Sequence, residues 1–330
     1  MRNVPTSNSY DFGRTAAQVI QSALENLTVI SSGGTVSSSD STMMLARLNM
    51  IAKQYQGTAD GSPGLKIHTR QRVTLFPQKG QQMYLVGPAS TDARATTSYG
   101  RTTISANEAL GQTVISITSN TDTTTNPGTT VTMTSGDIVG IKLDDGSIQW
   151  TTISGTPAST MTITDSLTAA AASGNYVYWF TSRAQRFPVI ESAVLRDENR
   201  NDTELTIFRT ARDYDLGVPD KYADGDPTCI LVEPLRIATR VTLDSQPTDV
   251  TKQIVLTVQY PAEDYDATTD DIAFPQEAFR FLVWELAFDA CDAFGKEWTP
   301  SMEKKRLEAR NSYLSLNPEV SNLYFQSGGL

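Results

Sequence analysis

Residues 254–291, IVLTVQYPAEDYDATTDDIAFPQEAFRFLVWELAFDAC, contain the two hydrophobic patterns on which the fold of this chain depends. The segment 253–260 is apolar over the length of a strand. Further on, apolar residues recur at helical spacing: Phe279, Leu282, Val283, Leu286, Ala290 and Phe294. Pro275 suits the first turn of this helix, and Gly295 suits its end. The stretch therefore predicts an α+β protein whose strands are followed by C-terminal helices.

The same reasoning predicts three more helices. Apolar stripes over 9–57 indicate two helices joined by Gly33-Gly34 and a serine-rich loop, which form an antiparallel hairpin. A charged helix is expected from the N-cap Thr299 to about Leu314. We expect these helices to pack with strands, which the pattern predicts at 73–76, 82–86, 204–208, 229–232, 236–243 and 253–260.

Residues 91–182 have a different composition. Threonine occupies 23 of these 92 positions, and charged side chains are sparse. Short β-branched runs are separated by turn signals such as 126–128 and 144–146, at a spacing of roughly ten residues. This pattern predicts an inserted all-β domain, either Ig-like or a small barrel.

Composition excludes several classes of function. The 330 residues carry 37 acidic and 27 basic side chains, a net charge of −10, which argues against a general nucleic-acid or anionic-membrane binder. Two cysteines, Cys229 and Cys291, and one histidine, His68, do not make a disulfide framework or a zinc site. We expect a soluble protein of a reducing compartment, with no cofactor, no metal, no secretory signal and no membrane-spanning segment.

The sequence contains no strong catalytic motif. His68 lies in a basic strand-like segment, and no phosphate-binding loop or zinc motif occurs. Acidic clusters at 220–226 and 263–271 lack the spacing of a calcium loop, and we interpret them as solvated loops. Paired carboxylates for glycoside hydrolysis stay open, because any two could approach in space. The aromatic run 176–180 indicates inner-face packing more than a ligand platform. We expect that the chain is not an enzyme.

The segment after Asn317-Pro318 has no periodicity, yet it contains Leu323, Tyr324 and Phe325. Apolar anchors in an otherwise unstructured terminus usually have a partner surface. We therefore expect it to be disordered in the free monomer and ordered on a partner. An expression scar is the alternative, because 322–327 resembles a protease-tag site, but no tag follows it.

The order of segments resembles a known family. The hairpin with LARLNMIAKQYQ (45–56) is followed by VTLFPQKGQQMYLVGP (73–88), RFPVIESAVLRDENRNDTELTIFRTARDYDLGVPDKYADGDPTCILV (186–232) and the stretch 254–291. Over roughly 10–90 and 184–316 this order is similar to the head-to-tail adaptor proteins of P22-type short-tailed phages, also called packaged-DNA stabilisation or tail accessory proteins. The insertion departs from the shorter members of the family.

The resemblance implies a domain map. Residues 1–90 and 183–316 would be the two halves of an adaptor domain, 91–182 the insertion and 317–330 an extended portal-binding tail. The implied tail contacts are Leu316, Val320, Leu323, Tyr324, Phe325 and Leu330. The implied candidates for the interface between ring subunits are Arg14, Arg47, Lys304, Lys305, Arg306 and Arg310.

The function implied is that of a virion connector. Identical subunits, made in the cytoplasm of a bacterial host, would form a twelve-fold ring under the portal protein at the head-tail interface. The ring would extend and seal the DNA channel, let DNA slide without sequence-specific binding, and carry other tail proteins such as a nozzle, hub or fibres. Two alternatives stay open: a tail-associated receptor- or glycan-binding protein, and a virion-associated peptidoglycan hydrolase.

Overall fold

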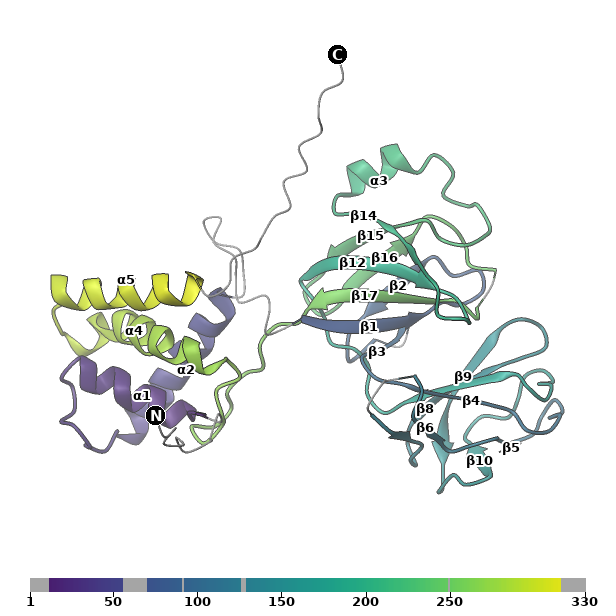
Figure 1. Ribbon diagram of the computed structural model, residues 1–330, viewed down its shortest axis with the longest axis horizontal. Helices are drawn as coiled ribbons and strands as arrows, with labels where there is room; N and C mark the ends of the chain where they lie inside the picture. Colours follow the sequence, from purple (N-terminus) through teal and green to yellow (C-terminus); the bar gives the residue numbers. More distant parts are fainter. Residues whose placement is uncertain (1–11, 56–69, 91, 126–128, 249, 316–330) are drawn as a thin grey trace, which may run out of the picture. The chain divides into compact units, whose positions relative to one another are not determined.

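The computed structural model describes residues 12–55, 70–90, 92–125, 129–248 and 250–315. It is an α+β protein, as the sequence predicts, and it divides into two compact units (Figure 1). The helical unit comprises residues 1–69 and 261–330, and the β unit comprises residues 70–260. The divisions fall at 69/70 and 260/261, so each half of the expected adaptor domain, 1–90 and 183–316, is itself shared between the two units.

The described part of the helical unit contains four α-helices. They are α1 (Ala16–Asn26), α2 (Ser38–Gln54), α4 (Phe279–Ala290) and α5 (Pro300–Ser315). Thr15 and Gln18 form a capping box at the start of α1, and Ser37 caps α2. Thr299 accepts a hydrogen bond from the amide of Met302 and so caps α5 as expected. Pro275 instead precedes a 3-10 turn (Gln276–Ala278) that leads into α4, so it is not the first residue of the α-helix.

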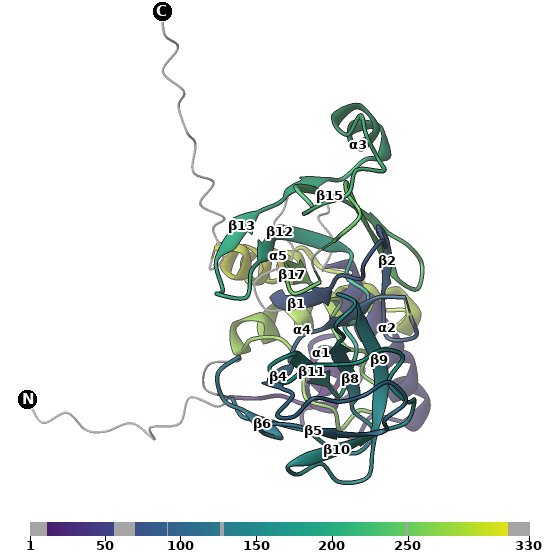
Figure 2. The ribbon, with the colours of Figure 1, turned by 90° about the vertical axis from the view of Figure 1, so that its right-hand side faces the viewer.

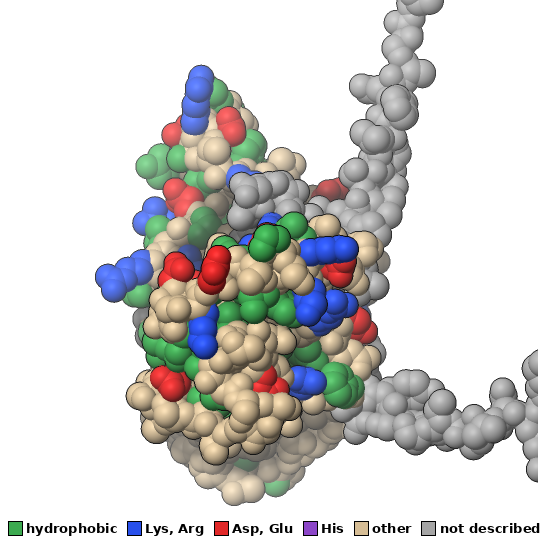
Figure 3. Space-filling model, turned by 90° about the vertical axis from the view of Figure 1, so that its left-hand side faces the viewer, with side chains coloured by type: hydrophobic (Ala, Val, Ile, Leu, Met, Phe, Trp, Pro, Cys, Tyr) green, Lys and Arg blue, Asp and Glu red, His purple; other side chains and the backbone are tan. Residues whose placement is uncertain are grey.

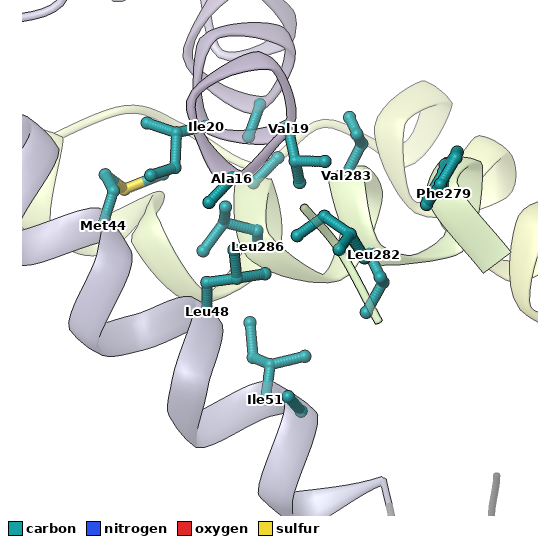
Figure 4. Packing of buried hydrophobic residues seen from close by; sticks show 14 of the residues in the cluster. Ala16, Val19, Ile20, Met44, Leu48, Ile51, Phe279, Leu282, Val283 and Leu286 are labelled. Carbon is teal, nitrogen blue, oxygen red and sulfur yellow. The ribbon is translucent and has the colours of Figure 1, made fainter. Parts of the chain in front are cut away.

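Helix α4 is the centre of this unit. Helices α1, α2 and α5 all pack against it, and Figures 1 and 2 both show α4 between α5 and α1. In Figure 4 the side chains of α1 and α2 point at Leu282, Val283 and Leu286 of α4. The described members of this core come from helices and the segment 262–274, and none comes from a strand.

Two sheets share one core in the β unit. The five-stranded sheet has the order β13-β12-β17-β1-β3, and the four-stranded sheet has the order β14-β15-β16-β2. The chain crosses from one to the other at Leu205, between β13 and β14. The strands are β1 (Arg70–Phe76), β2 (Met83–Val86), β3 (Arg94–Thr96), β12 (Val189–Arg196), β13 (Asp202–Glu204), β14 (Thr206–Phe208), β15 (Cys229–Pro234), β16 (Thr239–Leu243) and β17 (Gln253–Gln259); a short helix, α3 (Ala211–Gly217), follows β14.

The threonine-rich segment forms a sheet of its own, in the order β4-β11-β8-β9-β10-β5. A bridge between Ile104 and Ile117 and a hydrogen bond from the Thr118 amide to the Thr103 carbonyl (2.9 Å) join its two edge strands, which closes it as a small barrel. Its strands are β4 (Gly100–Thr103), β5 (Val114–Ser116), β8 (Ile138–Lys142), β9 (Ile148–Ser154), β10 (Thr160–Ile163) and β11 (Tyr176–Phe180), with a separate ribbon of β6 (Thr121–Asp122) and β7 (Val131–Thr132). Because β3 pairs with β1, the barrel begins later than residue 91.

Two tryptophans of the barrel each lie across a glycine on the neighbouring strand. Trp179 is opposite Gly100, and Trp150 is opposite Gly140. A Cβ at Gly140 would lie 2.7 Å from the Trp150 ring, and one at Gly100 would overlap the fully buried Trp179 ring. The indoles therefore occupy space that only glycine leaves open.

We expect Gly100→Ala to destabilise the barrel by about 1–3 kcal/mol, because the added methyl group overpacks a closed core. Urea-dependent amide exchange in β4, β8 and β11 would measure this loss. The exposed strand residue Thr162 provides the control, since Thr162→Ala should change little. Equal stability of the Gly100→Ala and Thr162→Ala variants would show that the indole has room to move.

Candidate functional site

All six basic residues predicted for a subunit interface belong to the helical unit, but they differ in exposure. Lys304 and Lys305 are exposed, whereas the four arginines are half-buried: Arg14, Arg47, Arg306 and Arg310. Three of these arginines contact other elements of their own unit. Arg47 and Arg306 link helices of the unit and Arg14 contacts α1, whereas Lys304 and Lys305 are exposed to solvent.

Arg306 is the most enclosed of the six. Its Nε and Nη2 atoms donate to the two carboxylate oxygens of Glu285 in α4 at 3.0 and 2.9 Å, and its guanidinium lies 3.8 Å from the Phe288 ring centroid. Burial disfavours the cation, but hydrogen bonds and charge from Glu285, and then from Glu303, outweigh burial and raise the pKa of Arg306. The side chain of Glu285 is only 5% exposed, so this is a buried ion pair.

Glu285 has a second partner directly after α2, at its C-cap. The Tyr55 hydroxyl donates to its Oε2 atom at 2.8 Å, and burial together with this hydrogen bond raises the pKa of Tyr55. On the other side, the Trp298 indole donates to Glu303, which also approaches Arg306. The network therefore links α2, α4, α5 and the turn before α5 through charge-assisted hydrogen bonds.

Two other arginines join elements at the edge of the unit. Arg47 of α2 pairs with Asp289 of α4 at 2.7 Å and also donates to its carbonyl. Arg14 donates to Ser22 at 3.0 Å, and its guanidinium lies 5.4 Å from the ring centroid of Phe12. Both side chains are thus engaged within one subunit.

The exposed lysines lie on α5. The ammonium of Lys305 is 5.6 Å from the ring centroid of Trp284, so its stem covers apolar surface while its charge stays in solvent. Figure 3 shows Lys and Arg side chains on the visible face, interspersed with Asp and Glu side chains and with hydrophobic side chains. We refer to Lys304 and Lys305 as the basic surface of α5.

An acidic loop, residues 263–271, lies beside α1 and α2. The Ala16 amide donates to the Asp270 carbonyl at 2.9 Å, and Asn49 exchanges two hydrogen bonds with the backbone of Tyr265. Lys53 neutralises Asp264, whereas Glu263 and Asp266 are exposed. Within the described part of the chain, no three His, Cys, Asp or Glu side chains group as metal ligands. The loop therefore offers fixed negative charge to solvent.

Several predicted residues lie outside the described residues: His68 and the tail positions Leu316, Val320, Leu323, Tyr324, Phe325 and Leu330. Cys229 and Cys291 are both buried and make no disulfide, and burial raises the pKa of the Cys229 thiol to about 11. Over the described ranges, no helix is long and apolar enough to cross a membrane. The aromatic side chains Tyr178, Trp179 and Phe180 are all buried. Trp179 lies in the barrel core, as inner-face packing predicts, whereas Tyr178 and Phe180 lie on the opposite face of the strand, in a cluster with Phe76.

Comparison of the sequence with models of protein families and with curated proteins gives no match.

Sequence reasoning missed Glu285, the residue that fixes Arg306. A signal was present, because Glu285 interrupts the apolar run FLVWELAF in the middle of the helix. A carboxylate at a position that faces the core requires a cationic or hydrogen-bonding partner. The sequence does not show which of the many basic residues provides it.

We expect Arg306→Met to destabilise the helical unit by about 3–5 kcal/mol, because it leaves the Glu285 carboxylate buried without its cation. Urea unfolding, followed by the fluorescence of Trp284 and Trp298, would measure the loss. Lys304→Met on the same helix is the matched control and should change stability by less than about 0.5 kcal/mol. Adding Glu285→Gln to Arg306→Met should recover part of the loss; no recovery would mean that Arg306 acts by packing alone.

Proposed function

We propose that this chain is a head-to-tail connector of a short-tailed phage and has no catalytic role. Identical subunits would assemble as a twelve-fold ring under the portal protein, extend and seal the DNA channel, and provide the platform for other tail proteins. The proposal includes the finer arrangement expected from the sequence: an adaptor body, an inserted β domain and an extended tail, 317–330, laid on the portal.

One observation carries the proposal: the helical unit has two surfaces of opposite charge, one on helix α5 and one on a loop beside α1 and α2. Lys304 and Lys305 lie on α5, whereas the acidic loop 263–271 is bonded to α1 and α2. Helix α4 lies between α5 and α1. A closed ring of identical subunits requires two different, complementary surfaces on each subunit. These two surfaces meet that requirement.

The overall charge supports the same role. A chain of net charge −10 gives a predominantly negative assembly. Lys and Arg contacts to phosphates would hold DNA by counterion release, and the free energy of such contacts would oppose sliding. An acidic channel lining keeps DNA mobile.

We expect the double variant Lys304→Glu, Lys305→Glu to lose ring assembly on the cognate portal, because the reversed charges would face the acidic loop of the neighbouring subunit. Electron microscopy of the mixture with the portal would measure ring occupancy. The matched control is Arg212→Glu, Arg236→Glu, which makes the same charge change at exposed sites of the β unit.

A charge swap makes the test specific. Adding Glu263→Lys and Asp266→Lys to the α5 double variant should restore assembly, because the two surfaces then exchange signs. If the fourfold variant stays unassembled while its fold is intact, the two surfaces do not contact each other in the ring. Normal assembly of the α5 double variant would contradict the proposed interface directly.

The tail has its own prediction. A chain that ends at Ser315 should keep its thermal midpoint, because the described core residues of both units all lie before this point. It should fail to join portal rings, since the proposed apolar anchors Leu323, Tyr324 and Phe325 are removed. Normal incorporation of the shortened chain would exclude the tail as the portal contact.

A further inference from the structure

The outer face of the five-stranded sheet carries a row of polar and cationic side chains. Residues of β1 alternate, so Val73 and Leu75 enter the core while Arg72 and Thr74 lie on the opposite face. The register places Thr74 opposite Val255 and Gln253 opposite Arg196. Arginines from β1 and β12 therefore share one face with Gln253 of β17.

The barrel covers part of this face. Phe76, on the same face of β1, packs against Tyr99 and Tyr178 of the barrel segment, with ring centroids 5.1 and 5.0 Å apart. Beside this aromatic contact is a cavity of about 280 Å³. Its walls come from both the sheet and the barrel: Arg72, Thr74, Thr97, Tyr99, Arg101, Thr125, Arg196, Asp197, Glu198, Arg200, Thr251, Gln253 and Val255.

The cavity has an excess of cations. Arg196 is neutralised by a bidentate pair with Asp202 at 2.7 and 2.8 Å. Among the described residues, Arg72, Arg101 and Arg200 make no ion pair with a carboxylate. Of the two acids in the lining, Asp197 already accepts two hydrogen bonds from Asn201. In a chain of net charge −10, this is a local positive site.

Its walls are held in place without a ligand. The buried carboxylate of Asp122 accepts hydrogen bonds from the Arg101 amide at 2.8 Å and from Thr124 and Thr125. Burial opposes its ionisation, but these donors hold the pKa of Asp122 at about 2. Arg200 has a left-handed backbone, with φ +68°, and its guanidinium donates to the Thr124 carbonyl at 2.7 Å. Unusual backbone of this kind persists where the surroundings impose it.

We propose that this cavity binds a phosphate ester of a small, hydroxyl-rich molecule, such as a sugar phosphate. In the pair of Arg196 with Asp202, one guanidinium group donates to both oxygens of one carboxylate. A phosphate has three acceptor oxygens and can receive hydrogen bonds from several guanidinium groups that line different walls.

The remaining lining fits the rest of such a ligand. Thr74, Tyr99, Thr251 and Gln253 are buried polar side chains, and Val255 is the apolar member of the cavity wall. Hydroxyl and amide groups exchange hydrogen bonds with sugar hydroxyls. The volume suits a small ligand more than a polymer. This site is independent of the proposed connector function, because it uses none of the charged residues of the helical unit.

Titration calorimetry on the full chain tests the proposal with glucose 6-phosphate, inorganic phosphate and glucose. We expect one molecule of glucose 6-phosphate per chain, weaker binding of inorganic phosphate, and no binding of glucose. Arg72→Gln and Arg101→Gln should each weaken binding at least tenfold. Arg236→Gln, an exposed arginine of the same unit outside the cavity, should bind as the unaltered chain does.

Other outcomes would overturn the assignment. They are no binding of either phosphate probe, equal weakening by Arg236→Gln, glucuronate binding as tightly as glucose 6-phosphate, and binding of duplex DNA alone. Arg72 is exposed, so Arg72→Gln keeps the test valid if Arg101→Gln fails to fold. Both variants should still join portal rings, so a failure here is distinguishable from a failure of the proposed connector function.

Discussion

A carboxylate buried in the middle of an apolar helix constrains the helical unit. Glu285 lies in α4 with 5% of its side chain exposed, and its charge is offset by Arg306 from α5 and a hydrogen bond from Tyr55 at the end of α2. Packing α4 without either partner would bury an uncompensated charge, which costs far more than a missing apolar contact. The N-terminal and C-terminal helices must therefore assemble together, although residues 70–260 separate them in the sequence.

In the β unit, a cluster of aromatic side chains fixes how the barrel packs on the sheet. The barrel has its own core, but Phe76 and Val250 of the sheet region also cluster with Tyr99, Tyr178 and Phe180. The barrel is therefore held against the outer face of the sheet by this shared cluster as well as by the two chain segments that connect it. Edge-to-face contacts, such as that between Phe76 and Tyr99, favour one orientation over others. The arginine-lined cavity exists because this orientation leaves part of the polar face uncovered.

The sequence predicted the helices and strands better than it predicted which of them pack together. Helical spacing identified α1, α2, α4 and α5, and the turn signals identified an all-β insertion. The apolar stripe predicted for α4 was too narrow, because Phe281, Trp284 and Ala287 are buried as well. Three other helices surround α4 and bury most of its circumference. Lys304 and Lys305, which the sequence offered as interface candidates, are exposed on α5. The cavity could not, since Arg72, Arg101 and Arg200 come together only through strand register and the placement of the barrel.

A negative chain and a positive cavity are compatible because electrostatic effects in water are local. At physiological ionic strength the screening length is about 8 Å, so exposed carboxylates far from the cavity scarcely reduce the potential at its arginines. The buried part of the lining, which includes Thr74 and Gln253, lowers the local dielectric constant and strengthens the field of the nearby guanidinium groups. In the proposed connector, DNA would pass an assembly of net negative charge, whereas a small phosphate in the cavity would meet guanidinium groups that form no ion pair among the described residues. Size and depth, more than net charge, would then decide which phosphates the protein retains.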